Sequence, residues 1–476
     1  MGSSRGARNF VVSSLITPHR SRLRTLLVLA CASCAIGTGC GEKSVLLARD
    51  VGEGGGAGAP STSASPVLVA DVDIRAGGPY SRLLVGDLNG DGRFDLLTMQ
   101  PDVTTDNELP HAVVALTAFD LDGNQLWQVG TPDPKATGSA SDIPAQIYDL
   151  DGDGSNEVLA VMSDELLVLE GRTGKVEQRR PLPDPNAHDA IIIANLSGHE
   201  HPDDVILKNR FDTLWAYNRD FDLLFTFKGT LGYYPWPFDW NGDGRDELAA
   251  GPSFLSADGK ELWSCAAEID TTVDSVWSGD LDPKNGNGPE VIIGGGNTLV
   301  YGHDGTKRFS VDTVEAQNLA VGDFRPDIEG LEIAGLDRVV RTQNGRDALF
   351  VLSARGTLLA QEERPSGSGW STIMGMIHDW DGTGRDYLLA FGRNGEPPTV
   401  YDGKLNAVTT LPESSGLLMT ADMCGDTRTE IIAYSDTFVR IYATNDCPLD
   451  SHVTHEPRQQ PKSLYDWTRY WGGDAR

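Results

Sequence analysis

The sequence predicts an all-β fold, an eight-bladed β-propeller built from four-stranded blades. An acidic loop pattern recurs along the chain, starting at residues 87, 149, 195, 239, 280, 323, 379 and 422, so successive starts lie 41 to 62 residues apart. This spacing is close to the period of about 40 to 50 residues that propeller blades show. Each loop lies between two short apolar runs, and an apolar hairpin with a glycine-containing turn follows it, which gives four strands per unit. Seven blades is the alternative if the repeat at Asn195 is not a blade.

Three of the acidic loops are complete, at residues 87–95, 149–157 and 239–247. Oxygen-bearing side chains occupy loop positions 1, 3, 5 and 9, and glycines at positions 4 and 6 allow the sharp turn. Alternating oxygens that converge on one point suit Ca²⁺, which takes six to eight oxygen ligands. A strand follows each loop, whereas a helix follows the loop of an EF-hand. The predicted ligands are Asp87, Asn89, Asp91, Asp95, Asp149, Asp151, Asp153, Glu157, Asp239, Asn241, Asp243 and Glu247.

The other five loops carry fewer oxygen ligands. The loop at 280 offers Asp280, Asp282 and a Glu290 that comes two residues late, and the loop at 379 offers Asp379 and Asp381. The loops that start at 195, 323 and 422 are poorer still. Calcium is therefore the expected cofactor, with the number of filled loops left open.

Composition excludes several classes of partner. The 476 residues carry a formal net charge of −30, which disfavours binding to nucleic acid and to anionic membrane surfaces. The repeats form one large domain, and we expect a monomer.

The N-terminus indicates export. Basic residues precede an apolar run that is too short to span a bilayer comfortably, as in a secretory signal peptide. The run ends at Cys40 in a pattern typical of a bacterial lipoprotein cleavage site, so residues 1–39 are expected to be the signal and Cys40 to be acylated. Cys31 is a rival lipidation site, and an ordinary signal peptide without lipid is the other alternative. The expected location is the cell envelope, through a lipid anchor, or the medium.

The remaining chain divides into three parts. Residues 40–67 are rich in Gly, Ser and Pro and are expected to form a flexible tether. Residues 68–450 form the propeller, and the aromatic segment 451–476 is expected to pack on it. An oxidising compartment would allow Cys424 and Cys447 to pair, leaving Cys265 as a buried free thiol.

The repeats resemble the FG-GAP (VCBS) repeats of integrin-type propellers and, more closely, the rhamnogalacturonan lyases of polysaccharide lyase family 11. The resemblance runs in order from about residue 68 to the C-terminus, through residues 83–95, 119–127, 147–157, 279–283, 429–432 and 439–442. It implies an eight-bladed, calcium-rich propeller. Residues 142–145, 161–163 and 233–236 depart from the family's pattern of His-Tyr, Lys-Thr and His residues, so the resemblance leaves catalysis open.

β-Elimination from a uronate needs a cation to neutralise its carboxylate and a base to remove the C5 proton. In a propeller whose calcium loops join the first and second strands, the loops between the second and third strands lie on the opposite face. Lys208, Arg210, Arg338 and Arg341 fall in those loops, and we predict Lys208 as the base and the arginines as carboxylate ligands. Their alternative role is that of solvated loop residues.

The sequence therefore predicts an exported, calcium-stabilised propeller that binds or cleaves an acidic polysaccharide. The alternative from another class is a non-catalytic, integrin-like surface adhesion module whose partner is a protein.

Overall fold

A computed structural model describes residues 43–45, 65–102, 112–136, 144–338, 346–365, 372–392, 397–412, 417–426, 428–444 and 447–449. The chain divides into two compact units, Met1–Cys40 and Gly41–Arg476. All of the described residues belong to the second unit. None of their helices is long and apolar enough to cross a membrane. Arg341 and the C-terminal segment 451–476 lie outside the described residues.

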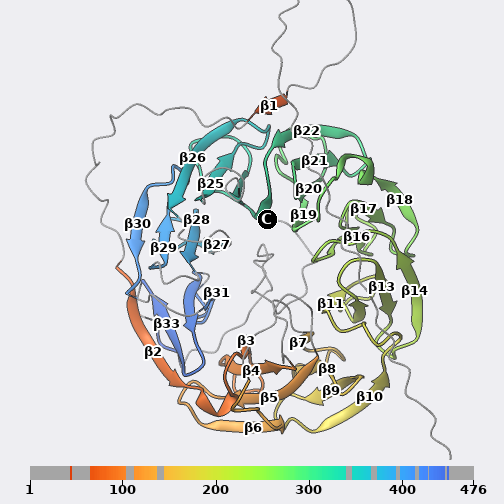
Figure 1. Ribbon diagram of the computed structural model, residues 1–476, viewed down its shortest axis with the longest axis vertical. Coiled ribbons are helices and arrows are strands. Elements are labelled where there is room, and N and C mark those ends of the chain that lie inside the picture. The colour runs from red at the N-terminus through yellow and green to blue at the C-terminus, as the bar shows by residue number, and fades with distance from the viewer. Residues whose placement is uncertain are drawn as a thin grey trace, which may run out of the picture. The chain divides into compact units, whose positions relative to one another are not determined.

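The second unit contains eight sheets arranged in a ring, each built on four antiparallel strands (Figure 1). The prediction of eight blades is confirmed, and the alternative of seven is wrong because the repeat at Asn195 forms a complete blade. Blade 1 consists of β3 (Arg82–Gly86), β4 (Asp95–Pro101), β5 (Val113–Phe119) and β6 (Gln125–Gly130), and blade 2 of β7 (Ala145–Tyr148), β8 (Glu157–Met162), β9 (Glu165–Glu170) and β10 (Val176–Pro181). Blade 3 consists of β11 (Ala190–Ala194), β12 (Asp204–Lys208), β13 (Thr213–Tyr217) and β14 (Leu223–Lys228), and blade 4 of β15 (Trp236–Phe238), β16 (Glu247–Ala250), β17 (Ser253–Leu255) and β18 (Glu261–Ser264).

Blades 5 to 7 follow the same order. They consist of β19 (Ser275–Gly279), β20 (Glu290–Gly294), β21 (Thr298–Gly302) and β22 (Lys307–Asp312); β23 (Ala316–Gly322), β24 (Glu332–Asp337), β25 (Arg346–Leu352) and β26 (Leu358–Pro365); and β27 (Thr372–His378), β28 (Asp386–Gly392), β29 (Thr399–Tyr401) and β30 (Ala407–Thr410). Two short 3₁₀ helices, Arg75–Gly77 and Ala266–Glu268, lie in the connections.

The last blade is completed by a strand from the other end of the chain. β31 (Leu417–Ala421), β32 (Glu430–Tyr434) and β33 (Phe438–Ala443) form its first three strands. β2 (Val67–Asp73) pairs antiparallel with β33 as the outer strand. Figure 1 shows β2 beside β33, and the pairing of these two strands, which are far apart in sequence, closes the ring. A further short strand, β1 (Lys43–Val45), lies within the segment predicted as a tether and pairs in parallel with β22.

Burial within a blade follows the position of the strand. All seven residues of β4 are buried, as are the five of β12, because these middle strands have a neighbouring blade on each face. The outer strand β10 alternates between half-buried and exposed residues, because one of its faces meets solvent.

Aromatic side chains on outer strands lock one blade to the next. Trp127, on the outer strand of blade 1, donates from Nε1 to the carbonyl of Gly171 in blade 2 at 2.6 Å. The hairpin turn beside it contains Gly174, whose φ is +66°, and a Cβ there would come within 2.6 Å of the Trp127 ring. Trp263 and Gly305 repeat this contact between blades 4 and 5. Glycine at these turns is thus required both by the backbone and by the packing.

Candidate functional site

The acidic loops all connect the first and second strands of a blade, so they lie at one face of the ring. In the loop of blade 2, one carboxylate oxygen from each of Asp149, Asp151 and Asp153 lies within 4.8 Å of the other two. Asp149 accepts the backbone N–H groups of Gly152 at 2.8 Å and Gly154 at 2.9 Å. The two glycines have φ values of +74° and +90°, as the sequence predicts for this turn.

The same turn forms in the other two complete loops. Asp87 accepts Gly90 N–H at 2.7 Å and Gly92 N–H at 2.9 Å. Asp239 accepts the corresponding groups of Gly242 at 2.8 Å and Gly244 at 2.9 Å. The position-3 side chain turns toward the position-5 backbone, because Asn241 accepts the N–H of Asp243 at 2.8 Å and Asn89 that of Asp91 at 2.9 Å. The predicted ligand residues at positions 1 and 3 of these two loops therefore turn inward onto the loop backbone.

The carboxylate at position 9 has a structural role that sequence reasoning missed. Glu157 is 8% exposed and accepts the backbone N–H of Leu150, at loop position 2, at 2.8 Å. Asp95 and Glu247 bond the position-2 N–H of their own loops in the same way. Asp204, Glu290, Glu332 and Glu430 hold the backbone at positions 2 or 3 of four further loops. The carboxylate therefore closes the loop whether or not it also binds a cation.

Burial and neighbouring carboxylates raise the pKa of these position-9 groups. The pKa of Glu157 rises to about 7, chiefly through burial, with smaller contributions from Asp151, Asp149 and Asp153. The pKa values of Asp95 and Glu247 also rise to about 7 for the same first cause. A cation in the loop would oppose this shift, because it favours the ionised form.

The donors present fit a calcium ion. Calcium binds oxygen at 2.3–2.6 Å, so two ligands on one ion lie no more than about 5 Å apart, and the Asp149 triad meets that limit. In blade 5, Asp282 is 2% exposed, and neither of its carboxylate oxygens has a hydrogen-bond partner among the described residues. The exposed Arg355 guanidinium lies 3.6 Å from one of these oxygens. A buried carboxylate without hydrogen bonds is costly unless a cation accompanies it.

In blade 7 the chain supplies its own cation. Arg385 bonds to Asp381 at 2.8 Å and lies 4.8 Å from the ring of Tyr387, which replaces the acid at position 9. Asp379 accepts the N–H of Gly384 at 2.5 Å, so the turn is kept. The assignment of Asp379 and Asp381 to a calcium site stays a prediction of the sequence. The guanidinium that already pairs with Asp381 favours the complete loops over this one as calcium sites.

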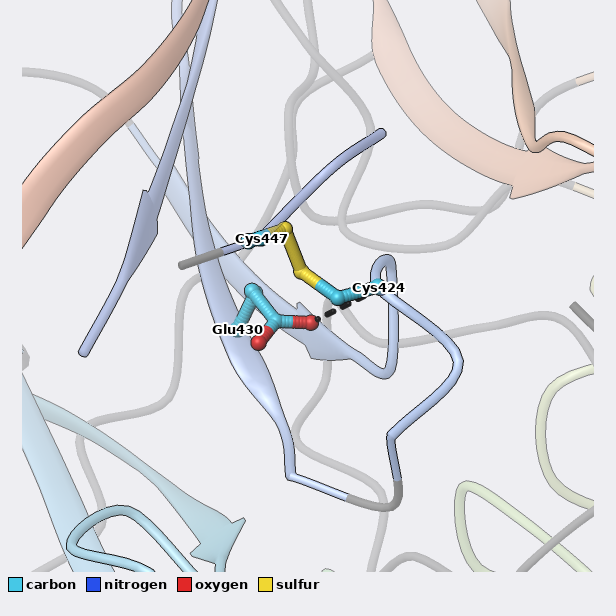
Figure 2. A group of neighbouring side chains, drawn as sticks. All are labelled: Cys424, Glu430 and Cys447. Carbon is cyan, nitrogen blue, oxygen red and sulfur yellow. Dashed lines mark hydrogen bonds between the residues drawn. A yellow bond between two sulfur atoms is a disulfide. The ribbon is translucent and has the colours of Figure 1, made fainter. Parts of the chain in front are cut away.

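In blade 8 a disulfide takes the place of a ligand (Figure 2). Cys424, at loop position 3, is bonded to Cys447 beyond β33, with the two Cα atoms 5.3 Å apart. Glu430 accepts the backbone N–H of Cys424 at 3.2 Å. The predicted pairing is confirmed, and Cys265 is a buried free cysteine, as predicted.

The loops also fasten neighbouring blades. Asn156 donates from its side-chain amide to the carbonyl of Asp87 in the preceding loop at 2.7 Å. His201, in blade 3, donates from Nε2 to the carbonyl of Asp149 at 2.5 Å and stacks on Tyr148, with ring centroids 5.3 Å apart. Each loop is therefore part of a seam between two blades, and a change in one loop reaches its neighbour.

The opposite face brings together two of the predicted catalytic residues. Lys208, which is fully buried, donates from Nζ to the Asp189 carboxylate and, at 2.9 Å, to the carbonyl of Arg210. Arg210 donates from Nε to the other Asp189 oxygen at 3.0 Å, and its guanidinium lies 5.0 Å from the ring of Tyr233. Sequence reasoning missed Asp189. The available signal was its position, immediately before the first strand of the blade whose second strand ends at Lys208.

Arg338 lies at the corresponding end of blade 6 rather than blade 3. Its side chain is fully buried and donates from Nη2 to the carbonyl of Thr372, the first residue of β27, at 3.2 Å. Of the four predicted catalytic residues, Lys208 and Arg210 therefore lie together in blade 3 and Arg338 lies in blade 6. The fourth, Arg341, lies outside the described residues.

Comparisons with known proteins agree with this architecture. A family model described as rhamnogalacturonan lyase family 11, C-terminal domain, matches residues 78–176. The rhamnogalacturonan exolyase YesX of Bacillus subtilis is 24% identical over 463 residues, covering 78% of this chain and 72% of the relative. The endolyase YesW of the same organism is 28% identical over 263 residues, covering 42% of this chain and 41% of the relative.

The chain is an eight-bladed propeller whose sequence is similar to rhamnogalacturonan lyases. The crystal structure of YesX superposes on it with a TM-score of 0.57 and 20% identity, covering 81% of this chain and 75% of the other. The biofilm matrix protein Bap1 of V. cholerae superposes with a TM-score of 0.55 and 15% identity, covering 80% and 88%. Both likenesses show a shared fold, which in this lyase-like propeller has eight blades.

Proposed function

We propose that the lyase-like propeller acts on an acidic polysaccharide of the rhamnogalacturonan type. The observation that carries the proposal is the sequence similarity to a rhamnogalacturonan exolyase along 78% of the chain. The resemblance follows the order of the blades, so it concerns the whole ring rather than one calcium-type loop. The integrin-like adhesion module is not favoured, because the relatives matched by sequence are lyases.

The two faces of the ring would have different roles, one in stability and the other in substrate binding. Calcium in the acidic loops would supply rigidity to one face by neutralising carboxylates that otherwise repel one another. On the other face, Arg210 is held by Asp189 and lies against Tyr233, an arrangement that suits a uronate carboxylate and the sugar ring that carries it. A substrate carboxylate bound there loses part of its negative charge to the guanidinium, which makes the adjacent C5 proton easier to remove.

A binding protein without lyase activity is the second candidate, and the surroundings of Lys208 favour it. A general base must be neutral and within reach of the proton that it removes. Lys208 is fully buried, and its ammonium group is paired with Asp189, which stabilises the charged form. In this arrangement Lys208 supports Arg210 rather than facing a substrate.

One incubation separates the candidates. The protein is mixed with rhamnogalacturonan and calcium, and the ultraviolet absorbance of unsaturated uronate is followed. Rising absorbance that Arg210→Ala abolishes indicates a lyase. Unchanged absorbance with retarded migration in a gel containing rhamnogalacturonan indicates a binding protein. If the wild type neither cleaves nor is retarded, the proposed function is wrong.

We further propose that the protein is exported, anchored through a lipid on Cys40, and monomeric. The basic segment and apolar run before Cys40 support export and anchoring. Cys40→Ala should release the protein from the membrane fraction, whereas Cys31→Ala should leave it there. The reverse result would assign the anchor to Cys31. Size-exclusion chromatography of the released protein should give a mass near or below 51.3 kDa, and a doubled mass would refute the monomer.

A further inference from the structure

A pocket lies between blade 8 and blade 1. This seam pocket is a cavity of about 290 Å³ whose lining includes Tyr80, Ser81, Arg82, Tyr434, Ser435 and Asp436. Arg82 begins the first strand of blade 1, and Tyr434 ends the second strand of blade 8. These strand ends lie at the face opposite the acidic loops, the same face as Lys208 and Arg210. Neither the predicted site residues nor the family match assigns a role to this pocket.

Tyr80 is held in a conformation that packing does not explain. Its φ is +60°, a left-handed conformation that is strained for a bulky residue, and its side chain is 40% exposed. A buried ring could justify such strain through its contacts, whereas an exposed ring gains little from them. Strain of this kind is typical of sites where a side chain must be presented in one orientation.

Three side chains fix the backbone on both sides of this tyrosine. Asp436, from blade 8, accepts the Tyr80 N–H at 2.7 Å. Gln100 is fully buried and donates to the carbonyl of Pro79 at 2.9 Å. Ser81 donates from Oγ to the carbonyl of Gly77 at 2.9 Å. The platform is therefore built before any ligand arrives, which lowers the entropy cost of binding.

The chemistry of the lining indicates a sugar. An exposed aromatic ring offers a flat apolar face to the C–H groups of a pyranose, and Arg82, Asp436 and Ser435 offer charged and hydroxyl groups around it. A guanidinium among them suits a carboxylate.

We propose that the seam pocket is a second sugar-binding subsite, which takes a uronate-containing segment of a polysaccharide with Tyr80 as its stacking platform. The inference rests on the proposed function for its substrate class. It adds a second binding position on the same face, in different blades from the Asp189 cluster. Two separate positions on one face suit a long polymer better than a single free sugar.

The test is the variant Tyr80→Gly, which removes the ring and relieves the positive φ at once. We expect its melting temperature to equal or exceed that of the wild type, because glycine adopts this backbone conformation freely. We expect the Kd for rhamnogalacturonan oligosaccharides, measured by titration calorimetry, to weaken about tenfold through the lost stacking. Tyr80→Phe keeps the ring and should bind like the wild type.

Phe221→Gly is the matched control, because Phe221 is also an aromatic residue at positive φ, +62°, but it lies in the turn between β13 and β14, at the face of the acidic loops. It should leave the Kd unchanged. Equal binding by wild type and Tyr80→Gly would overturn the subsite while leaving the proposed function in place. A parallel loss of melting temperature and affinity in Tyr80→Gly would overturn it too, because Tyr80 would then be structural. Failure of the wild type to bind would overturn both.

Discussion

Chelation of calcium is expected to lower the melting temperature of this propeller by about 10 °C. With free calcium at 100 times its Kd, a filled site adds about 2.7 kcal/mol to the free energy of unfolding. Unfolding entropies of about 2.1 cal/mol/K per residue, over roughly 380 propeller residues, give about 0.8 kcal/mol/K. One site is then worth about 3 °C, and the three complete loops together about 10 °C. Differential scanning calorimetry in calcium and in excess EGTA measures the difference.

Two matched substitutions show whether the acidic loops are responsible. Asp151→Asn removes one charge from a triad whose oxygens lie within 4.8 Å of one another, so it should remove about a third of the calcium-dependent shift. Asp381→Asn makes the same chemical change in a loop where Arg385 already pairs with the acid at 2.8 Å. It should lower the melting temperature equally in calcium and in EGTA, because it breaks an ion pair and leaves the calcium-dependent shift intact.

The reasoning fails if EGTA leaves the melt unchanged. It also fails if both variants reduce the calcium-dependent shift by the same amount, because the Arg385 loop would then bind calcium as the complete loops do. A shift that magnesium restores as well as calcium would show a less selective cation site than the oxygen count implies.

Three further predictions concern residues outside the complete loops. Cys447→Ser should lower the free energy of unfolding by about 3 kcal/mol, as expected for a disulfide that spans 23 residues, and a reductant should have the same effect on the wild type in urea titrations. Asp189→Asn leaves the buried Lys208 ammonium without its counter-charge and should cost about 3–5 kcal/mol, with Lys208→Met in the same chain restoring most of it. Burial raises the pKa of Asp337 from 3.8 to about 6, so the folded state holds this proton more tightly than the unfolded state does, and the wild type should lose up to about 3 kcal/mol as the pH rises from about 4 to 7. Asp337→Asn should lack that component, and an identical pH profile for the two proteins would contradict the assignment.

The architecture could be predicted from the sequence because its signals are local. Each complete acidic loop, with its glycines, occupies nine consecutive residues, and the apolar runs beside it are the strands that it connects. Even the poor repeat at Asn195 was placed correctly, because its spacing fits the series although its ligands do not. The completion of blade 8 by β2 was not predicted. A strand's composition does not say which distant strand it will pair with, and β2 pairs with β33 from the other end of the chain.

The candidate catalytic face was harder to predict for the same reason. Lys208 and Arg210 were found because they are two residues apart in one loop. Asp189, which decides their ionic environment, precedes Lys208 by 19 residues, and only the pairing of β11 with β12 brings it near. Arg338 likewise donates to the carbonyl of Thr372, which lies 34 residues later in the next blade. Sequence patterns predict which residues lie in the same loop, but not which residues from different loops form ion pairs.

The acidic loops differ in their charged partners, but nearly all of them are closed by a carboxylate that bonds the loop backbone. This closure is a structural role that does not depend on calcium binding. A carboxylate at position 9, or one or two residues later, bonds the loop backbone in seven blades, including the blade whose position 3 is Cys424. Blade 7 has Tyr387 at that position and keeps its turn through the Asp379 contact with Gly384. A folded blade therefore needs a closed loop, and a guanidinium or a disulfide beside the loop is compatible with it. The complete loops retain acids beyond those that closure requires. Those extra carboxylates add repulsion to the folded state unless a cation binds there, which is the physical reason to expect calcium in them and not in the loop of Arg385.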